Sequence, residues 1–468
     1  MSIVNINISV TNPPKPSALL KSGALISQGG TNLAAGSYRL LTSATDITSL
    51  LASEVIQSIT WESSTSGTNN VALIELAAPH GWNIGDAVKV TISGVTPSGY
   101  NGTFTATVIS TTAFTIPMET NPGAASVMGT VTPYAATELS QMNTSYWAQG
   151  TSRAVYVLEL GEGTTQQGVA YLATFIAEDI SMGNTYQKFF SYLVPREWDA
   201  DATFKTLCGL YTTPASLVKF FVTTTVATYA AWVSTAFPNV MALVESPDIP
   251  ATEFSMAAVF QSSLSNDPGS ANKVPPMAYR FMYGTTVYPI ENNSAVLKSL
   301  EAANISYIGS SAEGGLSNMM LVKGNMLDGK PFNYWYSVAW TAINLELDLA
   351  NEVINGSNTT INPLYFDQDG IDRLQKRALK TMRNGVTYGL ILGQVIDTKL
   401  TTDVFNANFN NGDYTGNAVI NAVPFADYTA ANPSDYQDGK YGGLSAVMTP
   451  KRGFDSITFN VNVTNFVG

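Results

Sequence analysis

Residues 154–178 read AVYVLELGEGTTQQGVAYLATFIAE and contain, in this order, an apolar run, a glycine-rich turn and a helical pattern. Residues 154–160 predict a β-strand, and residues 166–178 predict a helix that begins directly after the turn. A strand followed at once by a helix is the unit of folds in which helices pack on a mainly parallel or mixed sheet. This stretch therefore sets the expected fold class.

The same alternation continues from residue 153 to residue 308. Further strands are expected at 188–194, 217–223, 241–245, 278–283 and 305–309, and further helices at 204–210, 253–264 and 294–303. The pattern predicts an α/β fold, of mixed α+β character, with residues 21–56 and 138–330 as its core.

The turn at residues 161–168, Gly-Glu-Gly-Thr-Thr-Gln-Gln-Gly, has the glycine content of a phosphate-binding loop. It lacks both the GxGxxG spacing of dinucleotide sites and the Gly-Lys-Ser/Thr ending of a Walker loop. We therefore interpret it as a plain strand-to-helix turn and expect no cofactor.

Residues 57–137 differ in composition from the rest of the chain, because they are rich in Thr, Ser, Gly and Asn and contain no Lys or Arg except Lys89. We predict a small all-β module inserted into the larger domain, with Asn101-Gly102 as a tight hairpin turn. Its strands are expected at 71–76, 87–92, 103–109, 113–117 and 127–132.

Residues 331–450 are expected to form a helical and mixed C-terminal domain. In its first helix, apolar residues recur at helical spacing at Val338, Ala342, Leu345, Leu349 and Val353. Gly356 is placed to end this helix. A second helix is predicted at 370–384, with Gly385 as its C-cap.

Three carboxylates stand at the start of this second helix: Asp367, Asp369 and Asp372. Their spacing suggests calcium, but an EF-hand loop needs a glutamate at its twelfth position, which is Ala378 here. We therefore interpret them as residues that cap the helix, and leave open whether they also bind a cation.

The second helix also holds five of the chain's 23 basic residues, namely Arg373, Lys376, Arg377, Lys380 and Arg383. Their spacing places them on one broad face, opposite Ile371, Leu374 and Met382. Such a face is either solvated or docked on an acidic protein surface, and the residues alone leave both readings open.

Both ends of the sequence alternate apolar and polar residues with the period of a β-strand. In an N-terminal arm, residues 1–20, the apolar positions that we single out are Ile3, Ile6, Ile8 and Val10. In a C-terminal arm, residues 451–468, they are Ile457, Phe459, Val461 and Val463. Each arm either adds an edge to the sheet of its own domain or pairs with a neighbouring subunit.

Charged residues make up 12% of the 468 residues, about half the share of an ordinary soluble protein, and the net charge is −12. This balance argues against a nucleic-acid binder that works by neutralising phosphates. A surface so poor in charge indicates that partners cover much of it.

The chain has one histidine, His80, and one cysteine, Cys208, which excludes a Cys/His zinc cluster and an intrachain disulfide. Catalysis by a histidine would need an orienting carboxylate, for which Asp86 is the nearby candidate. We interpret His80 instead as a structural turn residue. Because no sequence cue selects an acid pair among the 35 acidic residues either, we expect no metal and no enzyme.

Residues 1–8 lack the basic and apolar regions of a signal peptide. The most apolar of the long uncharged stretches, residues 220–244, is interrupted by threonines, Ser234 and Pro238. We therefore expect synthesis in the cytoplasm and no insertion into a membrane.

Several short blocks of the sequence are distinctive in combination. They are residues 3–10, the C-terminal block, residues 145–150 (SYWAQG) before 155–157 (VYV), residues 80–116, and above all residues 335–393 with NGSN at 355–358, INPLY at 361–365, DGI at 369–371 and YGL at 388–390. Together they resemble bacteriophage contractile tail sheath proteins of the myovirus type, in a divergent branch with an inserted β-module.

The resemblance implies a structural virion protein that polymerises as stacked six-fold rings around a tail tube and contracts to drive the tube through the host envelope. Its partners would be copies of itself, the tail tube protein, and the baseplate and tail terminator proteins. The resemblance also implies that the arms add strands to sheets of neighbouring subunits. It makes the helix carrying Arg373–Arg383 the candidate tube-facing helix of a tube-facing domain, residues 331–450.

Two other classes stay open. A virion surface adhesin or carbohydrate-binding structural protein would suit the inserted module, with Trp82 and Tyr100 as sugar-contacting rings. A hydrolase built on the α/β region is the third class.

Overall fold

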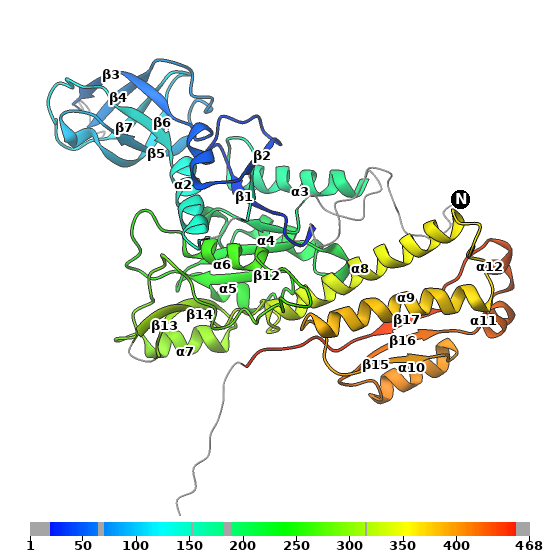
Figure 1. Ribbon diagram of the computed structural model, residues 1–468. Helices are drawn as coiled ribbons and strands as arrows, with labels where there is room; N and C mark the ends of the chain where they lie inside the picture. The colour runs from blue at the N-terminus through cyan, green and yellow to red at the C-terminus, as the bar shows by residue number, and fades with distance from the viewer. Residues whose placement is uncertain (1–18, 64–69, 151–152, 182–188, 314–315, 455–468) are drawn as a thin grey trace, which may run out of the picture.

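The computed structural model describes residues 19–63, 70–150, 153–181, 189–313 and 316–454 (Figure 1). These residues form a mixed α/β structure with one large sheet, a small closed barrel and a second, three-stranded sheet. The expected fold class is therefore confirmed. All eight apolar positions assigned to the two arms lie outside the described residues.

The large sheet contains β1 (Gly23–Ser27), β2 (Tyr38–Leu41), β9 (Val155–Glu159), β10 (Ser191–Leu193), β11 (Lys219–Thr224), β12 (Val240–Val244), β13 (Ser306–Glu313) and β14 (Leu316–Val322). Their order across the sheet is β14-β13-β12-β11-β10-β1-β9-β2. The six inner strands are parallel, and β14 and β2 at the two edges are antiparallel to their neighbours. The strands that follow β1 in the sequence therefore lie on both sides of it, with β9 and β2 on one side and β10 to β14 on the other.

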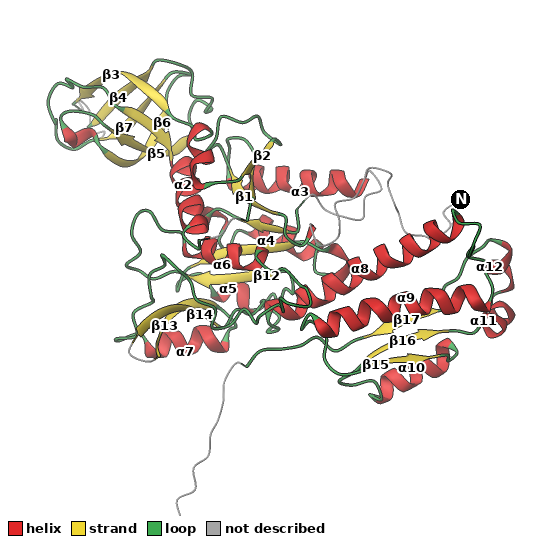
Figure 2. Ribbon diagram, viewed as in Figure 1, coloured by secondary structure: helices red, strands yellow, loops and turns green. Residues whose placement is uncertain are grey.

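Helices cover both faces of this sheet (Figure 2). One face packs against α2 (Tyr134–Trp147), α6 (Ser255–Leu264) and the first half of α8 (Phe332–Ser357). The other packs against α3 (Thr165–Ser181), α4 (Ala202–Leu210), α5 (Ala230–Val233) and α7 (Ser294–Ala302). Short 3₁₀ helices lie at Ala44–Ser49, Ser98–Tyr100, Arg196–Trp198 and Pro214–Ser216. Because both faces are covered, β10, β11 and β12 are buried at every position.

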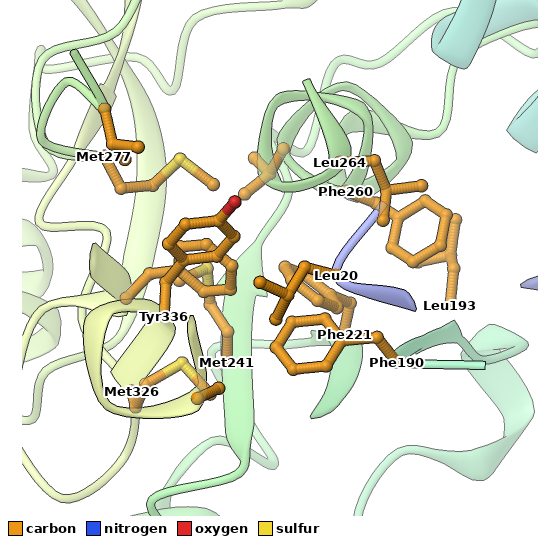
Figure 3. Packing of buried hydrophobic residues seen from close by; sticks show 14 of the residues in the cluster. Leu20, Phe190, Leu193, Phe221, Met241, Phe260, Leu264, Met277, Met326 and Tyr336 are labelled. Atoms are coloured by element: carbon orange, nitrogen blue, oxygen red, sulfur yellow. The ribbon is translucent and has the colours of Figure 1, made fainter. Parts of the chain in front are cut away.

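The core between the sheet, α6 and α8 is built from large apolar side chains (Figure 3). Phe221 of β11 and Phe260 of α6 meet edge to face, with ring centroids 5.3 Å apart. Tyr336 of α8 is also buried there, at 1% exposure. Burial of each such side chain contributes about 1.5–3 kcal/mol, which fixes α8 on the sheet.

The expected strand at 278–283 is wrong. This segment is irregular and forms only a single bridge, between Phe281 and Met320. The guanidinium group of Arg280 donates hydrogen bonds to the carbonyls of Ser262, Pro275 and Pro276 at 2.6–3.0 Å. These bonds, together with the left-handed backbone of Tyr279 (φ +64°), interrupt the regular extended conformation of a strand.

The small barrel consists of β3 (Glu54–Glu62), β4 (Val71–Leu76), β5 (Ala87–Ser93), β6 (Gly102–Val108), β7 (Ala113–Pro117) and β8 (Thr130–Pro133), closed in the order β3-β4-β7-β6-β5-β8. Its interior is filled by fully buried side chains such as Ile74, Val90 and Phe114. Figure 1 shows that it joins the large sheet beside α2. The fold class therefore includes the expected small all-β unit.

Two local expectations in the barrel are wrong. Asn101-Gly102 does not form a two-residue hairpin turn, because residues 94–101 separate β5 from β6. The Asn101 side chain instead bonds both the N–H and the C=O of Val95, at 2.9 Å each, and so ties this longer loop together. The last strand begins at Thr130, since Val127 forms only an isolated bridge with Thr96.

The C-terminal part contains a sheet of β15 (Val395–Thr398), β16 (Ala418–Ala422) and β17 (Leu444–Val447), with α9 (Gln368–Thr387), α10 (Thr402–Asn411), α11 (Phe425–Ala431) and α12 (Pro433–Gln437). β16 lies in the centre, parallel to β15 and antiparallel to β17. Its Ile420 belongs to the core shared with α9, and its Val419 packs on Phe405 of α10. The sheet is thus covered on both faces, and within the described ranges no strand pairs with either of its two edges.

Both glycines expected at helix ends act differently. Gly356 lies inside α8, where an added Cβ would come 2.4 Å from the Cβ of Leu364. Gly385 lies inside α9, where a Cβ would come 2.5 Å from Ile391 Cδ1. The left-handed residue after α9 is Gly389, with φ +77°. Close packing, and not helix termination, therefore explains the first two glycines.

Candidate functional site

The C-terminal sheet has two open edges. In the described part of the chain, β15 and β17 pair only with β16, and no strand pairs with their outer sides. Asp397 of β15 and Ala446 of β17 are exposed, and Ile396 is 38% exposed. An unpaired strand edge presents a row of backbone donors and acceptors that a further strand can bind.

The helix with the basic cluster forms an antiparallel hairpin with α8, as Figure 1 shows. Arg373 donates to Glu352 at 2.7 Å, and Arg377 donates to Asp348 at 2.6 Å. Arg373 also binds the carbonyls of Asn362 and Pro363, which close the hairpin. Two of the five clustered cations therefore hold α9 against α8.

The other three cations of the cluster, Lys376, Lys380 and Arg383, are exposed. None of them forms an ion pair with a carboxylate among the residues that the structure describes. Their spacing of four and three residues places them on one side of α9. The structure thus narrows the candidate docking face from five residues to these three.

Two of the three acidic residues at the start of α9, Asp367 and Asp372, have hydrogen-bond partners. Asp367 is the N-cap and accepts from Gly370 N at 2.8 Å, which confirms the capping interpretation for this residue. Asp372 binds Lys399 Nζ with both oxygens at 2.8 Å. In the described residues, no group of three His, Cys, Asp or Glu side chains is arranged to hold a metal ion.

An apolar groove of about 530 Å³ opens where the C-terminal part of α8 turns into the N-terminal part of α9. Its walls include Val353 of α8, Ile371 and Leu374 of α9, Tyr428 of α11 and Leu444 of β17. Leu444 is the first residue of β17, so the groove begins where one open edge begins. Nearby side chains are strongly exposed, among them Ile361 at 94% and Tyr365 at 67%.

His80 is a structural turn residue, as expected. It is 6% exposed, its Nδ1 accepts from Trp82 N at 3.0 Å, and its ring stacks on Trp82. Asp86, the carboxylate considered for catalysis, accepts instead from Asn83. Burial lowers the pKa of His80, which keeps the ring neutral at pH 7.

The two rings considered for sugar binding are buried. Tyr100 is 1% exposed and donates to the carbonyl of Gly123 at 2.9 Å. Trp82 is 8% exposed and has one face covered by His80. Stacking on a sugar requires a free ring face, so neither residue supports the carbohydrate-binding alternative.

The turn at 161–168 is a strand-to-helix turn, as interpreted from its sequence. Gln167 Oε1 accepts from Thr164 N at 2.9 Å and so caps α3. Glu159 Oε1 accepts from Gly161 N at 2.7 Å. The amide groups of Gly161 and Thr164 in this turn are therefore bound by protein side chains.

The carboxylates that bind the basic cluster were not foreseen. Asp348 and Glu352 lie four residues apart on α8, facing Arg373 and Arg377, also four apart, on α9. The signal was present in the sequence, since an acidic helix directly precedes a basic one and opposite charges at matched spacing favour an antiparallel pair.

None of the helices in the described ranges is both long and apolar enough to cross a membrane. No family model and no curated protein matches the chain. Among solved structures, the chain is distantly similar to a sheath tail protein from Desulfitobacterium hafniense. The identity is 11%, the alignment covers 82% of this chain and 89% of the other, and the TM-score is 0.33.

Proposed function

We propose that this chain is the structural subunit of a contractile phage tail sheath, and that it assembles through strand exchange between neighbouring copies. The observation that carries the proposal is the pair of open edges on β15 and β17, in a chain with strand-like sequences at residues 3–10 and 457–464. Each copy would thus carry both terminal strands that can be donated and sheet edges that can accept them, as a repeating assembly requires.

Each arm is long enough to cover one of the open edges. An eight-residue arm spans about 26 Å when extended, and a four-residue edge spans about 13 Å, at about 3.3 Å per residue. One arm therefore covers an edge of β15 or β17 and has residues to spare for a link to its own subunit. Main-chain hydrogen bonds would supply affinity, and the alternating apolar side chains would supply register.

Exposed apolar surface on the C-terminal part supports an assembled state. Ile361 and Tyr365, in the segment that joins α8 and α9, are 94% and 67% exposed. Large apolar side chains gathered on one part of a surface mark contacts with other proteins. The 12% content of charged residues points the same way.

The sequence resemblance supplies the finer part of the proposal. The subunits form stacked six-fold rings around a tail tube, and Lys376, Lys380 and Arg383 contact an acidic tube surface. Contraction moves the subunit bodies while the exchanged arms keep the lattice connected, with the free-energy difference stored in subunit packing. Baseplate and terminator proteins hold the two ends of the sheath. The domain at 331–450 faces the tube, and the barrel lies outside the shared scaffold.

Cysteine cross-linking between two differently tagged chains tests the strand exchange. Cys208 is buried and is replaced by serine, so that the background carries no thiol. One chain carries cysteine in an arm, at Asn7 or Asn460, and the other carries it on an edge, at Asp397 or Ala446. We expect a disulfide between the two tagged chains under mild oxidation, because paired strands bring side chains within bonding range.

A cysteine at the exposed Glu291, in the turn before α7, is the control. It should cross-link to neither arm. Cross-links that form equally well to Glu291 and to the two edges, or that form at none of them, would refute the exchange.

A further inference from the structure

A polar crevice lies at the carboxyl ends of the central strands of the large sheet. It has a volume of about 580 Å³ and is lined by residues that follow β1, β9 and β10, by the start of α2, and by the barrel segment 82–89. The strand order reverses at β1, since the chain continues to β9 on one side and from β10 to β13 on the other. Crevices outside the carboxyl ends of strands at such a reversal are the usual ligand sites of open α/β sheets.

The wall of this crevice is acidic. Its ionisable side chains are one ammonium group, on Lys89, and four carboxylates, on Asp86, Glu138, Glu162 and Glu197. Glu162 and Glu197 are exposed and make no hydrogen bond or ion pair with any other described residue. This charge balance disfavours phosphates, nucleotides and other anions.

Glu138 adds a buried and incompletely satisfied oxygen. The residue is 3% exposed and lies on the crevice wall. Its Oε1 accepts from Arg196 N at 3.1 Å and from the Arg196 guanidinium at 3.4 Å, whereas no described group donates to its Oε2. Arg196 is shared with Glu245, which accepts at 2.8 and 3.1 Å. One cation thus serves two buried carboxylates, and Glu138 Oε2 has no donor among the described residues.

The aromatic rings of the crevice are already covered, which disfavours a sugar. Trp198 is fully buried and donates to Gln28 Oε1 at 3.0 Å, and Trp82 stacks on His80. Lys89 Nζ lies 3.5 Å from the centre of the Tyr134 ring. The crevice therefore already accommodates one ammonium group, and two of its carboxylates, on Glu162 and Glu197, are paired with no cation among the described residues.

We propose that this crevice binds a small aliphatic amine, with Glu162 and Glu197 as the carboxylates that recognise its ammonium groups and Glu138 Oε2 as a further acceptor. The volume exceeds that of a single ion and suits a molecule with several heavy atoms. This inference does not depend on the proposed sheath function.

The electrostatics at Glu162 agree with this assignment. Burial, Glu159 and Glu54 raise the pKa of the Glu162 carboxyl to about 7. The barrel also lies close, since a Cβ on Gly81 would come 3.3 Å from Glu162 Oε2. A bound ammonium group would favour the ionised form of this carboxyl and so lower its pKa.

Isothermal titration calorimetry on the full chain tests the proposal, with 1,4-diaminobutane and spermidine as probes and 1,4-butanediol as the neutral control. We expect saturable binding of about one amine per chain and no binding of the diol. E162Q and E197Q should each weaken the affinity by about 10-fold or more, since hydrogen bonds to charged groups contribute about 1.5–3 kcal/mol. Both residues are exposed, so both variants should fold.

E291Q is the matched control, because Glu291 is exposed, lies outside the crevice and leaves the chain with the same net charge as the test variants. Its affinity for the amines should equal that of the wild type. No saturable heat with millimolar amine, equal binding of the diol, or equal weakening in all three variants would overturn the proposal. The last result would show general counter-ion binding to a chain of net charge −12.

Discussion

Replacing Glu138 with glutamine should stabilise the protein at pH 8, because the ionised carboxylate is unfavourable where it lies. The Glu138 side chain is 5% exposed. Burial raises its pKa from 4.5 to about 7, although the charge of Arg196 and a hydrogen bond from its backbone act in the opposite direction. Burial also raises the pKa of Glu245, the second carboxyl at Arg196. The free-energy cost of removing the Glu138 carboxylate from water therefore exceeds the favourable interaction with Arg196, because Glu138 shares that guanidinium group with Glu245.

The magnitude follows from the difference between the folded and unfolded pKa. Between pH 4.5 and about 7 the folded state binds more protons at Glu138 than the unfolded state, so the free energy of unfolding falls as the pH rises through this window. The full shift corresponds to about 3 kcal/mol. E138Q keeps an acceptor oxygen for Arg196 N but has no charge to bury. It should therefore be more stable than the wild type by up to about 3 kcal/mol at pH 8, and nearly equal to it below about pH 4, where the carboxyl is protonated in both the folded and the unfolded state.

Urea unfolding followed by tryptophan fluorescence at both pH values measures this difference, with E291Q as the control. Some pH dependence should remain in E138Q, because the pKa of Glu162 is also raised, to about 7, and its contribution has the same sign. A variant that is less stable than the wild type at pH 8 would refute the reasoning. It would mean that the ionised Glu138 contributes to stability through Arg196.

Three further predictions concern the α8–α9 hairpin. The double charge reversal K376E/K380E should abolish assembly on tail tubes in an electron-microscopy assay. The melting temperature should not change, since both residues are exposed and unpaired among the described residues. Unchanged assembly would show that these two residues do not contact the tube. R377L should lower the free energy of unfolding by about 1–2 kcal/mol in urea titrations, because Asp348 then loses a partly buried partner. An unchanged value would show that the ion pair contributes nothing to stability. G385A should cost about 1–3 kcal/mol in the same titration, since its Cβ would lie 2.5 Å from a neighbouring side chain, and a gain in stability would instead indicate an ordinary exposed helix glycine.

The barrel strands show what the sequence reveals well. Val71–Leu76 and Ala113–Pro117 form β4 and β7 at the predicted bounds. In β4 the inner side chains, such as Ile74, alternate with outer ones, so the period of two is visible in the sequence. The cap at Asp367 was also predictable, since its partner is only three residues away.

The central strand of the large sheet was not predicted. β1 has five residues, GALIS, all of them buried, so it shows no alternation. The unforeseen roles of Gly356 and Gly385 likewise depend on tertiary contacts, with Leu364 and Ile391.

The acidic crevice could not have been found from the sequence either. Its carboxylates come from the barrel, α2 and the turns after β9 and β10, and only the fold brings Asp86, Glu138, Glu162 and Glu197 together. Each of them alone is an ordinary acidic residue among 35.

Negative-stain electron microscopy of the purified chain, and of a variant without residues 1–16, decides whether the protein assembles through its N-terminal arm. We expect tubes or stacked rings from the full chain and none from the shortened one. Assembly of both chains would contradict the role of the arm. Single, monodisperse particles from the full chain, even with tail-tube protein present, would contradict the sheath assignment itself.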